Sequence, residues 1–223
     1  PFDPEDAQSY EAGIKTELLD GRARFNIAGH WTDYTNLQVA TFQTIGYNVT
    51  NAPKAVTRGV EADFSALIVE GLTINLAAAY TDAHHVEFEK GPCPATSPAD
   101  IGNFPPGGLG NQGEDDFCDL SGERLLQAPE WSGSARINYR APIGNLGVLG
   151  MIGLDATFKD DVFYDLDLDP LDSQSAHWMF NAQLGLMDID GNWSFILRAK
   201  NLADKMIKTF GGDVPVFFGT HAA

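Results

Sequence analysis

Apolar and polar residues alternate along this chain in segment after segment, and this period of two constrains the fold more than any other feature. In the segment 72–80, Leu72, Ile74, Leu76, Ala78 and Tyr80 fall on one side of an extended backbone, and Thr, Asn and Ala residues fall between them. The same alternation recurs around residues 24–31, 60–66, 135–141, 178–187 and 193–200. Successive side chains of a strand point to opposite faces. The pattern therefore predicts β-strands with one apolar and one polar face.

Eight such strands are expected, at about residues 10–18, 23–42, 57–68, 72–90, 132–142, 147–164, 174–187 and 193–204. Short turns rich in Gly, Asp and Asn alternate with longer connections. The turns are expected near 19–22, 69–71, 143–146 and 188–192, and the longer loops near 43–56, 91–131, 165–173 and 206–223. Short periplasmic turns opposite long extracellular loops are typical of outer-membrane barrels. We therefore predict an all-β, antiparallel up-and-down transmembrane β-barrel.

The polar side chains of these strands would line the lumen of the barrel. This set comprises Arg24, Asn26, His30, Glu61, Asp63, Asn75, Arg136, Asn138, Arg140, Asn181, Gln183, Arg198 and Lys200. Long charged side chains suit a wide lumen better than a narrow one. The chain is therefore expected to be an incomplete part, of about eight strands, of a larger barrel of the 22-strand type. A small barrel closed by eight strands is the alternative.

Charge is concentrated in two of the predicted long loops. Seven acids and one arginine lie between residues 91 and 130, and six aspartates without a base lie between 160 and 172, in a chain of net charge −17. Such a surface repels polyanions, so nucleic acid is not an expected partner. No run of apolar residues approaches the length of a transmembrane helix, and the start at Pro1 suggests a piece of a longer protein.

Both cysteines of the chain, Cys93 and Cys118, fall in the predicted loop 91–131. In an oxidising compartment, a disulfide between them would close a loop of about 25 residues and stabilise it by about 3 kcal/mol. The alternatives are two free thiols or a metal site shared with His84 and His85. The cysteines lack the close pairing of structural zinc sites.

No catalytic or cofactor motif is complete in the sequence. Asp165, Asp167 and Asp169 are spaced like the start of a calcium loop, but its glycine and distal glutamate are absent. No Ser or Cys stands in a nucleophile elbow. The chain is therefore not expected to be an enzyme or to carry a cofactor.

Several short motifs occur in an order that resembles a known family. They are Tyr10-Glu11-Ala12-Gly13, Asn36-Leu37-Gln38, Gly59-Val60-Glu61, Ser121-Gly122-Glu123-Arg124 followed by Ala128-Pro129-Glu130-Trp131, and Asn201-Leu202-Ala203-Asp204-Lys205. In this order and at hairpin spacing, they resemble landmarks of the C-terminal part of the β-barrel of TonB-dependent outer-membrane receptors. The plug domain and the closing strand of that family have no counterpart in the sequence.

The resemblance implies a function as well as a fold. It implies energised uptake of a scarce nutrient, above all a ferric siderophore or another iron complex, across the outer membrane of a Gram-negative bacterium. The nutrient would bind at the extracellular loops, the strands would face outer-membrane lipid, and the TonB–ExbB–ExbD complex would act through the plug. A passive porin-like channel and a secreted β-sandwich that binds glycans are the alternatives.

Overall fold

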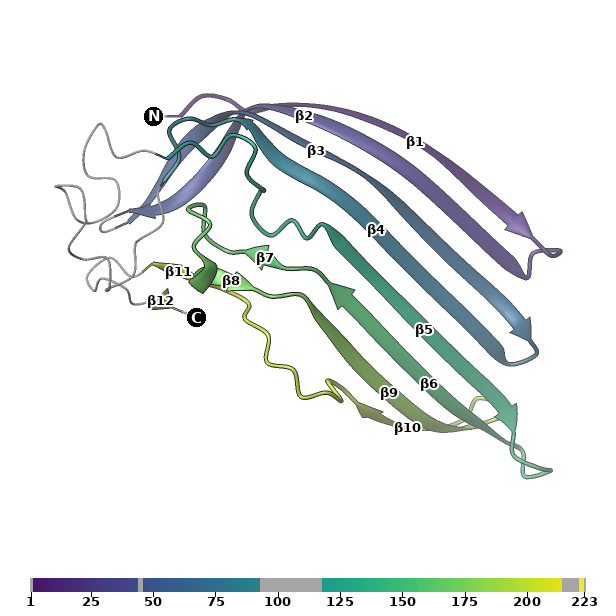
Figure 1. Ribbon diagram of the computed structural model, residues 1–223. Coiled ribbons are helices and arrows are strands. Elements are labelled where there is room, and N and C mark those ends of the chain that lie inside the picture. The colour runs from purple at the N-terminus through teal and green to yellow at the C-terminus, as the bar shows by residue number, and fades with distance from the viewer. Residues whose placement is uncertain (1, 44–45, 93–117, 214–220, 223) are drawn as a thin grey trace.

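The computed structural model describes residues 2–43, 46–92, 118–213 and 221–222 as one open antiparallel sheet with short additions (Figure 1). Eight strands form the sheet: β1 (Asp6–Leu18), β2 (Ala23–Gln43), β3 (Gly46–Val69), β4 (Leu72–Glu87), β5 (Trp131–Pro142), β6 (Val148–Lys159), β9 (His177–Asp188) and β10 (Ser194–Ala199). Two-residue ladders pair β7 (Val162–Phe163) with β8 (Ser173–Gln174) and β11 (Gly212–Asp213) with β12 (His221–Ala222). A 3₁₀ turn, η2, covers Pro170–Asp172.

The described residues include no helix of the length and apolarity needed to cross a membrane.

Strands that follow one another in sequence lie side by side in the sheet, in the order β1-β2-β3-β4-β5-β6-β9-β10. The short turns lie at one end of the sheet and the long connections at the other (Figure 1). Gly21, Gly71, Gly144 and Gly191 have positive φ in these short turns, a conformation that glycine adopts without a steric penalty. The predicted alternation of short and long connections is thus present, except in the β2–β3 hairpin.

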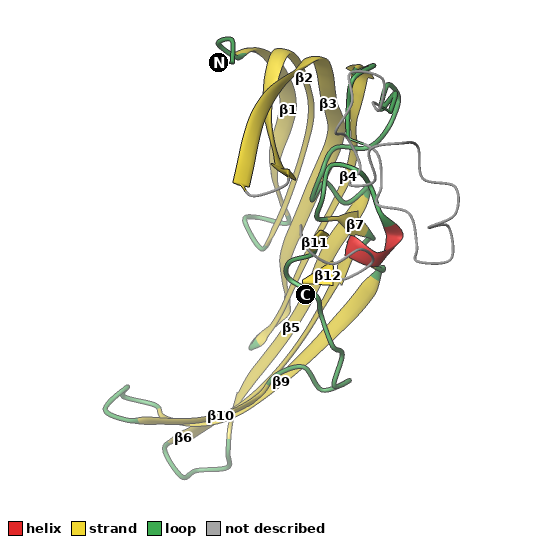
Figure 2. Ribbon diagram, turned by 90° about the vertical axis from the view of Figure 1, so that its left-hand side faces the viewer, coloured by secondary structure: helices red, strands yellow, loops and turns green. Residues whose placement is uncertain are grey.

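The sheet is open, because β1 and β10 form its two edges and pair with no further strand among the described residues. Seen from the side, the strands form a curved wall rather than a closed tube (Figure 2). The prediction of an all-β, antiparallel meander is confirmed.

The prediction of a loop at 43–56 is wrong. β2 and β3 stay paired from Ala23 opposite Ala66 up to Gln43 opposite Gly46. Pro53 lies within β3 although it cannot donate a ladder hydrogen bond. The hairpin accommodates Pro53 where the register skips Asn36, whose φ of 55° is left-handed. Asn tolerates that conformation, and the register of the hairpin is the same on both sides of it.

Four other strands are shorter than predicted, and the one expected at 72–90 ends at Glu87. The strand expected at 147–164 ends at Lys159, the one expected at 174–187 begins at His177, and the one expected at 193–204 ends at Ala199. Residues 160–176 instead form the β7–β8 ladder and η2. Alternation alone did not locate these ends, since apolar residues continue beyond each of them.

One face of the sheet is apolar and exposed. Its residues that are more than a third exposed include Ile14, Ile27, Val60, Leu76, Ile137, Leu154 and Leu184. Aromatic pairs lie toward the long connections: the ring centroids of Tyr80 and Trp131 are 4.9 Å apart and those of Phe158 and Trp178 are 5.1 Å apart. From Trp131 to Tyr139, β5 includes nine residues and runs about 27 Å at strand rise. At the tilt of about 40° usual for outer-membrane barrels, this length spans roughly 20 Å of the bilayer, somewhat less than the apolar band of about 25 Å.

A buried cluster holds the long connections onto the sheet. It joins Ala52 of β3 to Phe88, Leu120 and Leu166, which come from the two longest connections. Backbone hydrogen bonds support it: the Leu120 N–H donates to the Phe88 carbonyl at 2.9 Å. This loop cluster fixes the position of residues 118–126 against the end of β4.

His85 is buried beside the loop cluster, with 1% of its surface exposed. Its ring packs on Phe88 at a centroid distance of 4.9 Å. Both ring nitrogens lack a hydrogen-bond partner among the described residues. His85 lies beyond Tyr80 toward the long connections, outside the membrane-spanning part of β4. Burial and the neighbouring His84 lower the pKa of His85 from 6.5 to about 4.

Lowering the pH from 7 to 4 should loosen the loop cluster. Below pH 6.5, His85 binds a proton when the cluster opens to water, whereas the buried ring stays neutral until about pH 4. The free energy of opening should therefore fall across this window by roughly 3 kcal/mol at most. The hydrogen-exchange rate of the Leu120 amide in the complete protein measures this free energy of opening. The substitution His85→Phe should abolish the pH dependence, and an unchanged dependence would show that His85 does not cause it.

Candidate functional site: the polar face of the sheet

The polar residues predicted to share one face do share it by register. In one row across the sheet, Thr73 lies opposite Asn138, Asn138 opposite Gly153, Gly153 opposite Gln183, and Gln183 opposite Arg198. Arg24 and Arg140 lie nearer the short turns, and rows toward the long connections hold most of the other members of the set. These rows are Asn75, Arg136, Asp155 and Asn181; Asn26 and Asp63; and His30 beside Glu61 and Gly59.

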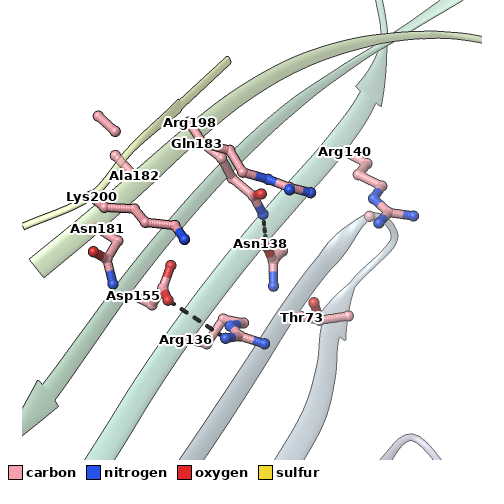
Figure 3. A pocket seen from close by; sticks show the side chains of 12 residues that line it. Thr73, Arg136, Asn138, Arg140, Asp155, Asn181, Ala182, Gln183, Arg198 and Lys200 are labelled. Carbon is pink, nitrogen blue, oxygen red and sulfur yellow. Dashed lines mark hydrogen bonds and ion pairs between the residues drawn. The ribbon is translucent and has the colours of Figure 1, made fainter. Parts of the chain in front are cut away.

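A groove of about 710 Å³ lies on this face where β5, β6, β9 and β10 run side by side. Seven of the predicted polar residues line it: Arg136, Asn138, Arg140, Asn181, Gln183, Arg198 and Lys200. Their side chains project from the same side of these strands (Figure 3). We call this site the basic groove.

An amide bridge crosses the floor of the basic groove. The Gln183 Nε2 donates to the Asn138 Oδ1 at 3.2 Å, across β6. The bridge passes over Gly153, where a Cβ atom would lie 2.6 Å from the Gln183 side chain and 2.7 Å from the Asn138 Oδ1. Only glycine leaves room for it. Sequence reasoning missed Gly153, although a glycine between polar positions was the signal that could have revealed it.

Positive charge in the basic groove is mostly unbalanced. Arg136 lies 3.5 Å from the Asp155 carboxylate, which β6 contributes from the next strand. The described residues offer no ion pair to Arg140, Arg198 or Lys200. Four cations therefore share one acid in a chain of net charge −17.

The other half of the polar face has the opposite balance. On β1–β3, this face carries the acids Glu11, Glu17, Glu61 and Asp63 and the bases Lys15 and Arg24. Asp63 accepts hydrogen bonds from Asn26 at 2.9 and 3.1 Å, and Arg24 lies 3.3 Å from Glu17. A second groove, of about 1,070 Å³, runs from this acidic half to β9 and is floored by small residues such as Ala77, Ala79 and Ser134.

Comparison with known proteins decides the family. A family model described as TonB dependent receptor-like, beta-barrel, matches residues 1–202. The chain belongs to the TonB-dependent receptors. Its place is therefore the outer membrane of a Gram-negative bacterium.

Individual relatives agree with the receptor family. The metal-pseudopaline receptor CntO of Pseudomonas aeruginosa is 39% identical over 88 residues, which are 40% of this chain and 12% of CntO. The ferric yersiniabactin uptake receptor FyuA from Yersinia pestis superposes with a TM-score of 0.69 at 18% identity, over 96% of this chain and 27% of FyuA. The siderophore receptor PiuA from Acinetobacter baumannii gives 0.62 at 19% identity, over 92% of this chain and 25% of PiuA. The chain thus spans about a quarter of these receptor structures.

Two glycine landmarks of the receptor occupy positions without room for a side chain. A Cβ atom on Gly59 would lie 2.2 Å from the Tyr80 carbonyl oxygen and 2.9 Å from the His30 ring. One on Gly13 would lie 2.9 Å from the Ile27 carbonyl oxygen. Each glycine lets the neighbouring strand approach closely.

Landmark residues at the ends of strands attach neighbouring segments. The Gln38 N–H donates to Glu5 at 2.8 Å, which ties the start of the chain to the β2–β3 hairpin. The Gly122 N–H, at a φ of 86°, donates to the His85 carbonyl at 2.7 Å. Trp131 begins β5 two residues after Pro129. Tyr10 pairs with Trp31 on the apolar face, next to Glu11 on the polar face.

Asn201 closes a turn at the end of β10. Its side chain accepts from the Lys205 N–H at 2.9 Å and donates to the Lys205 carbonyl at 3.0 Å. Both Asn201 and Asp204 have positive φ. The Leu202 N–H donates to the Phe180 carbonyl at 2.8 Å, and the Asn201 N–H donates to the Asn181 side chain at 2.9 Å. The turn therefore also holds one wall of the basic groove.

The predicted disulfide lies partly outside the described residues. Cys118 is disulfide-bonded, whereas Cys93 is not among the residues described. His84 contacts Asp82 at 2.7 Å, and no group of three or more His, Cys, Asp or Glu side chains suited to a metal ion occurs in the described part of the chain. Sequence reasoning also missed the ion pair between Arg124 and Asp161, at 2.7 Å, which links the two long connections.

Replacing Asn201 by Ala should loosen the turn. Both hydrogen bonds to Lys205 are lost, and Ala at a φ of 52° is strained, for a combined cost of about 2 kcal/mol. Exchange of the Leu202 amide should then be about 30-fold faster in the complete receptor. Asn145→Ala in the β5–β6 turn is the matched control and should leave this exchange unchanged. Equal exchange in the Asn201 variant would contradict the proposed role.

Proposed function

We propose that the complete protein imports a ferric siderophore or another metal chelate across the outer membrane by energised transport. The family match over residues 1–202 carries this proposal. The relatives named above are described as receptors for metal-pseudopaline, for ferric yersiniabactin and for a siderophore, and their ligands share the chemistry of a chelated metal.

The two faces of the sheet suit the two environments of such a receptor. The exposed apolar face would contact outer-membrane lipid, where strands must satisfy their backbone hydrogen bonds with one another. The polar face, with Arg24, Asn75, Arg140 and the other predicted residues, would line the lumen. The long connections would face outward and contribute to nutrient capture.

Partners follow from the same proposal. A plug domain outside this chain would fill the lumen, and TonB with ExbB and ExbD would rearrange it to release the nutrient. A passive porin-like channel would require neither a plug nor energy. Membership of the TonB-dependent receptors favours energised import over a passive channel.

Uptake measurements in cells that produce the complete protein test this function. A bacterial strain deleted for its own receptors should take up radioactive iron from a panel of ferric siderophores only when the gene is supplied. Uptake should disappear in the same strain without TonB, because energy reaches the outer membrane through TonB. Uptake that persists without TonB and rises linearly with concentration would instead indicate a passive channel.

A further inference from the structure

The apolar face of the sheet is hollowed where small residues of three strands lie side by side. Ala62 of β3 lies opposite Ala78 of β4, and Ala78 lies opposite Gly133 of β5. A groove of about 500 Å³ lies over this row, and its volume falls within the range of small-molecule sites. We call it the apolar groove.

Large apolar side chains form the walls of the apolar groove. Phe64 and Leu76 lie opposite one another in the next row toward the short turns, and Trp131 lies in the next row toward the long connections. Phe158 and Trp178 continue the row of small residues, and their ring centroids are 5.1 Å apart. The walls and floor are therefore suited to a hydrocarbon chain.

The apolar groove is complete within this chain. It lies mainly over β3, β4 and β5, each of which is paired on both sides, so further strands added at β1 or β10 would not cover it. A plug in the lumen would contact the opposite, polar face. The groove is continuous with the apolar face of an outer-membrane receptor, and lipid is therefore the surrounding medium.

Position along β5 indicates the leaflet that the groove faces. Gly133 is two residues from Trp131, at the end of β5 near the long connections, and six residues from Tyr139 near the short turns. Trp and Tyr are enriched at the two interfaces of a membrane. If the long connections face outward, as in the proposed function, the groove faces the outer leaflet, where the lipid of a Gram-negative outer membrane is lipopolysaccharide.

We propose that the apolar groove holds one acyl chain of lipid A, the lipid part of lipopolysaccharide, more tightly than the rest of the apolar face does. The inference rests on the orientation in the proposed function. Between apolar surfaces within lipid, association depends on van der Waals packing rather than on the hydrophobic effect. A chain seated between Trp131, Phe158 and Leu76 contacts protein atoms on its sides as well as below, whereas a chain on a flat surface contacts them on one side only.

Native mass spectrometry of the complete receptor, purified in mild detergent and supplied with hexa-acylated lipid A, tests the site. One lipid A molecule per receptor should remain bound after detergent has removed the other lipids. The double variant Ala62→Leu with Ala78→Leu fills the groove. It should retain about ten-fold less lipid A, because the loss of roughly ten carbon–carbon contacts corresponds to about this factor.

Ala141→Leu is the matched control, because Ala141 lies on the apolar face of β5 but near the short turns, outside the groove. This variant should retain as much lipid A as the unaltered receptor, and a normal β-sheet spectrum verifies the fold of each variant. Absence of retained lipid A, or equal retention by the double variant, would overturn the proposal. Equal or stronger retention of phosphatidylethanolamine, supplied in place of lipid A, would overturn it as well.

The measurement requires no transport, so the two proposals can fail separately. Lipid A retained by a protein that imports no chelate would refute the proposed function alone. Import of a chelate by a receptor that retains no lipid A would refute the apolar groove alone.

Discussion

Backbone hydrogen bonding between neighbouring strands is the constraint on which the rest of this structure depends. Within lipid, each N–H and C=O must find a partner in the protein. Here the ladder provides neighbours on both sides for the six inner strands and on one side for β1 and β10. Because the ladder fixes the register, it also fixes which side chains share a face. The apolar surface and the polar surface are therefore two consequences of one pairing scheme, and neither can shift by one residue without exchanging with the other.

The same register brings together residues that are remote in sequence. Asn138 and Gln183 are 45 residues apart and hydrogen-bond across a strand that has only a glycine between them. The long connections are attached in a different way. A small buried cluster and the ion pair of Arg124 with Asp161 hold them in place, outside the eight-stranded ladder. Backbone hydrogen bonds thus order the sheet, whereas contacts between side chains order the long connections.

Alternation was sufficient to predict the strands, the polar set and the short turns, because each depends on local sequence. It failed at 43–56, where β2 and β3 stay paired on both sides of Pro53 and of the left-handed Asn36 on the partner strand. It also failed to separate β6 from β7, since the chain turns there through contacts with residues around 173. The amide bridge was beyond prediction for a similar reason, as it depends on register across three strands and not on any pattern within one.

Charge is distributed unequally over the polar face of the sheet. Acids predominate on β1–β3 and bases on β5–β10. The electrostatic potential therefore changes from strand to strand across the sheet rather than along each strand. A neutral solute with a dipole moment would feel a torque here instead of a net pull. A dipolar solute lying against this face would therefore be biased to turn its positive end toward β1–β3 and its negative end toward β5–β10.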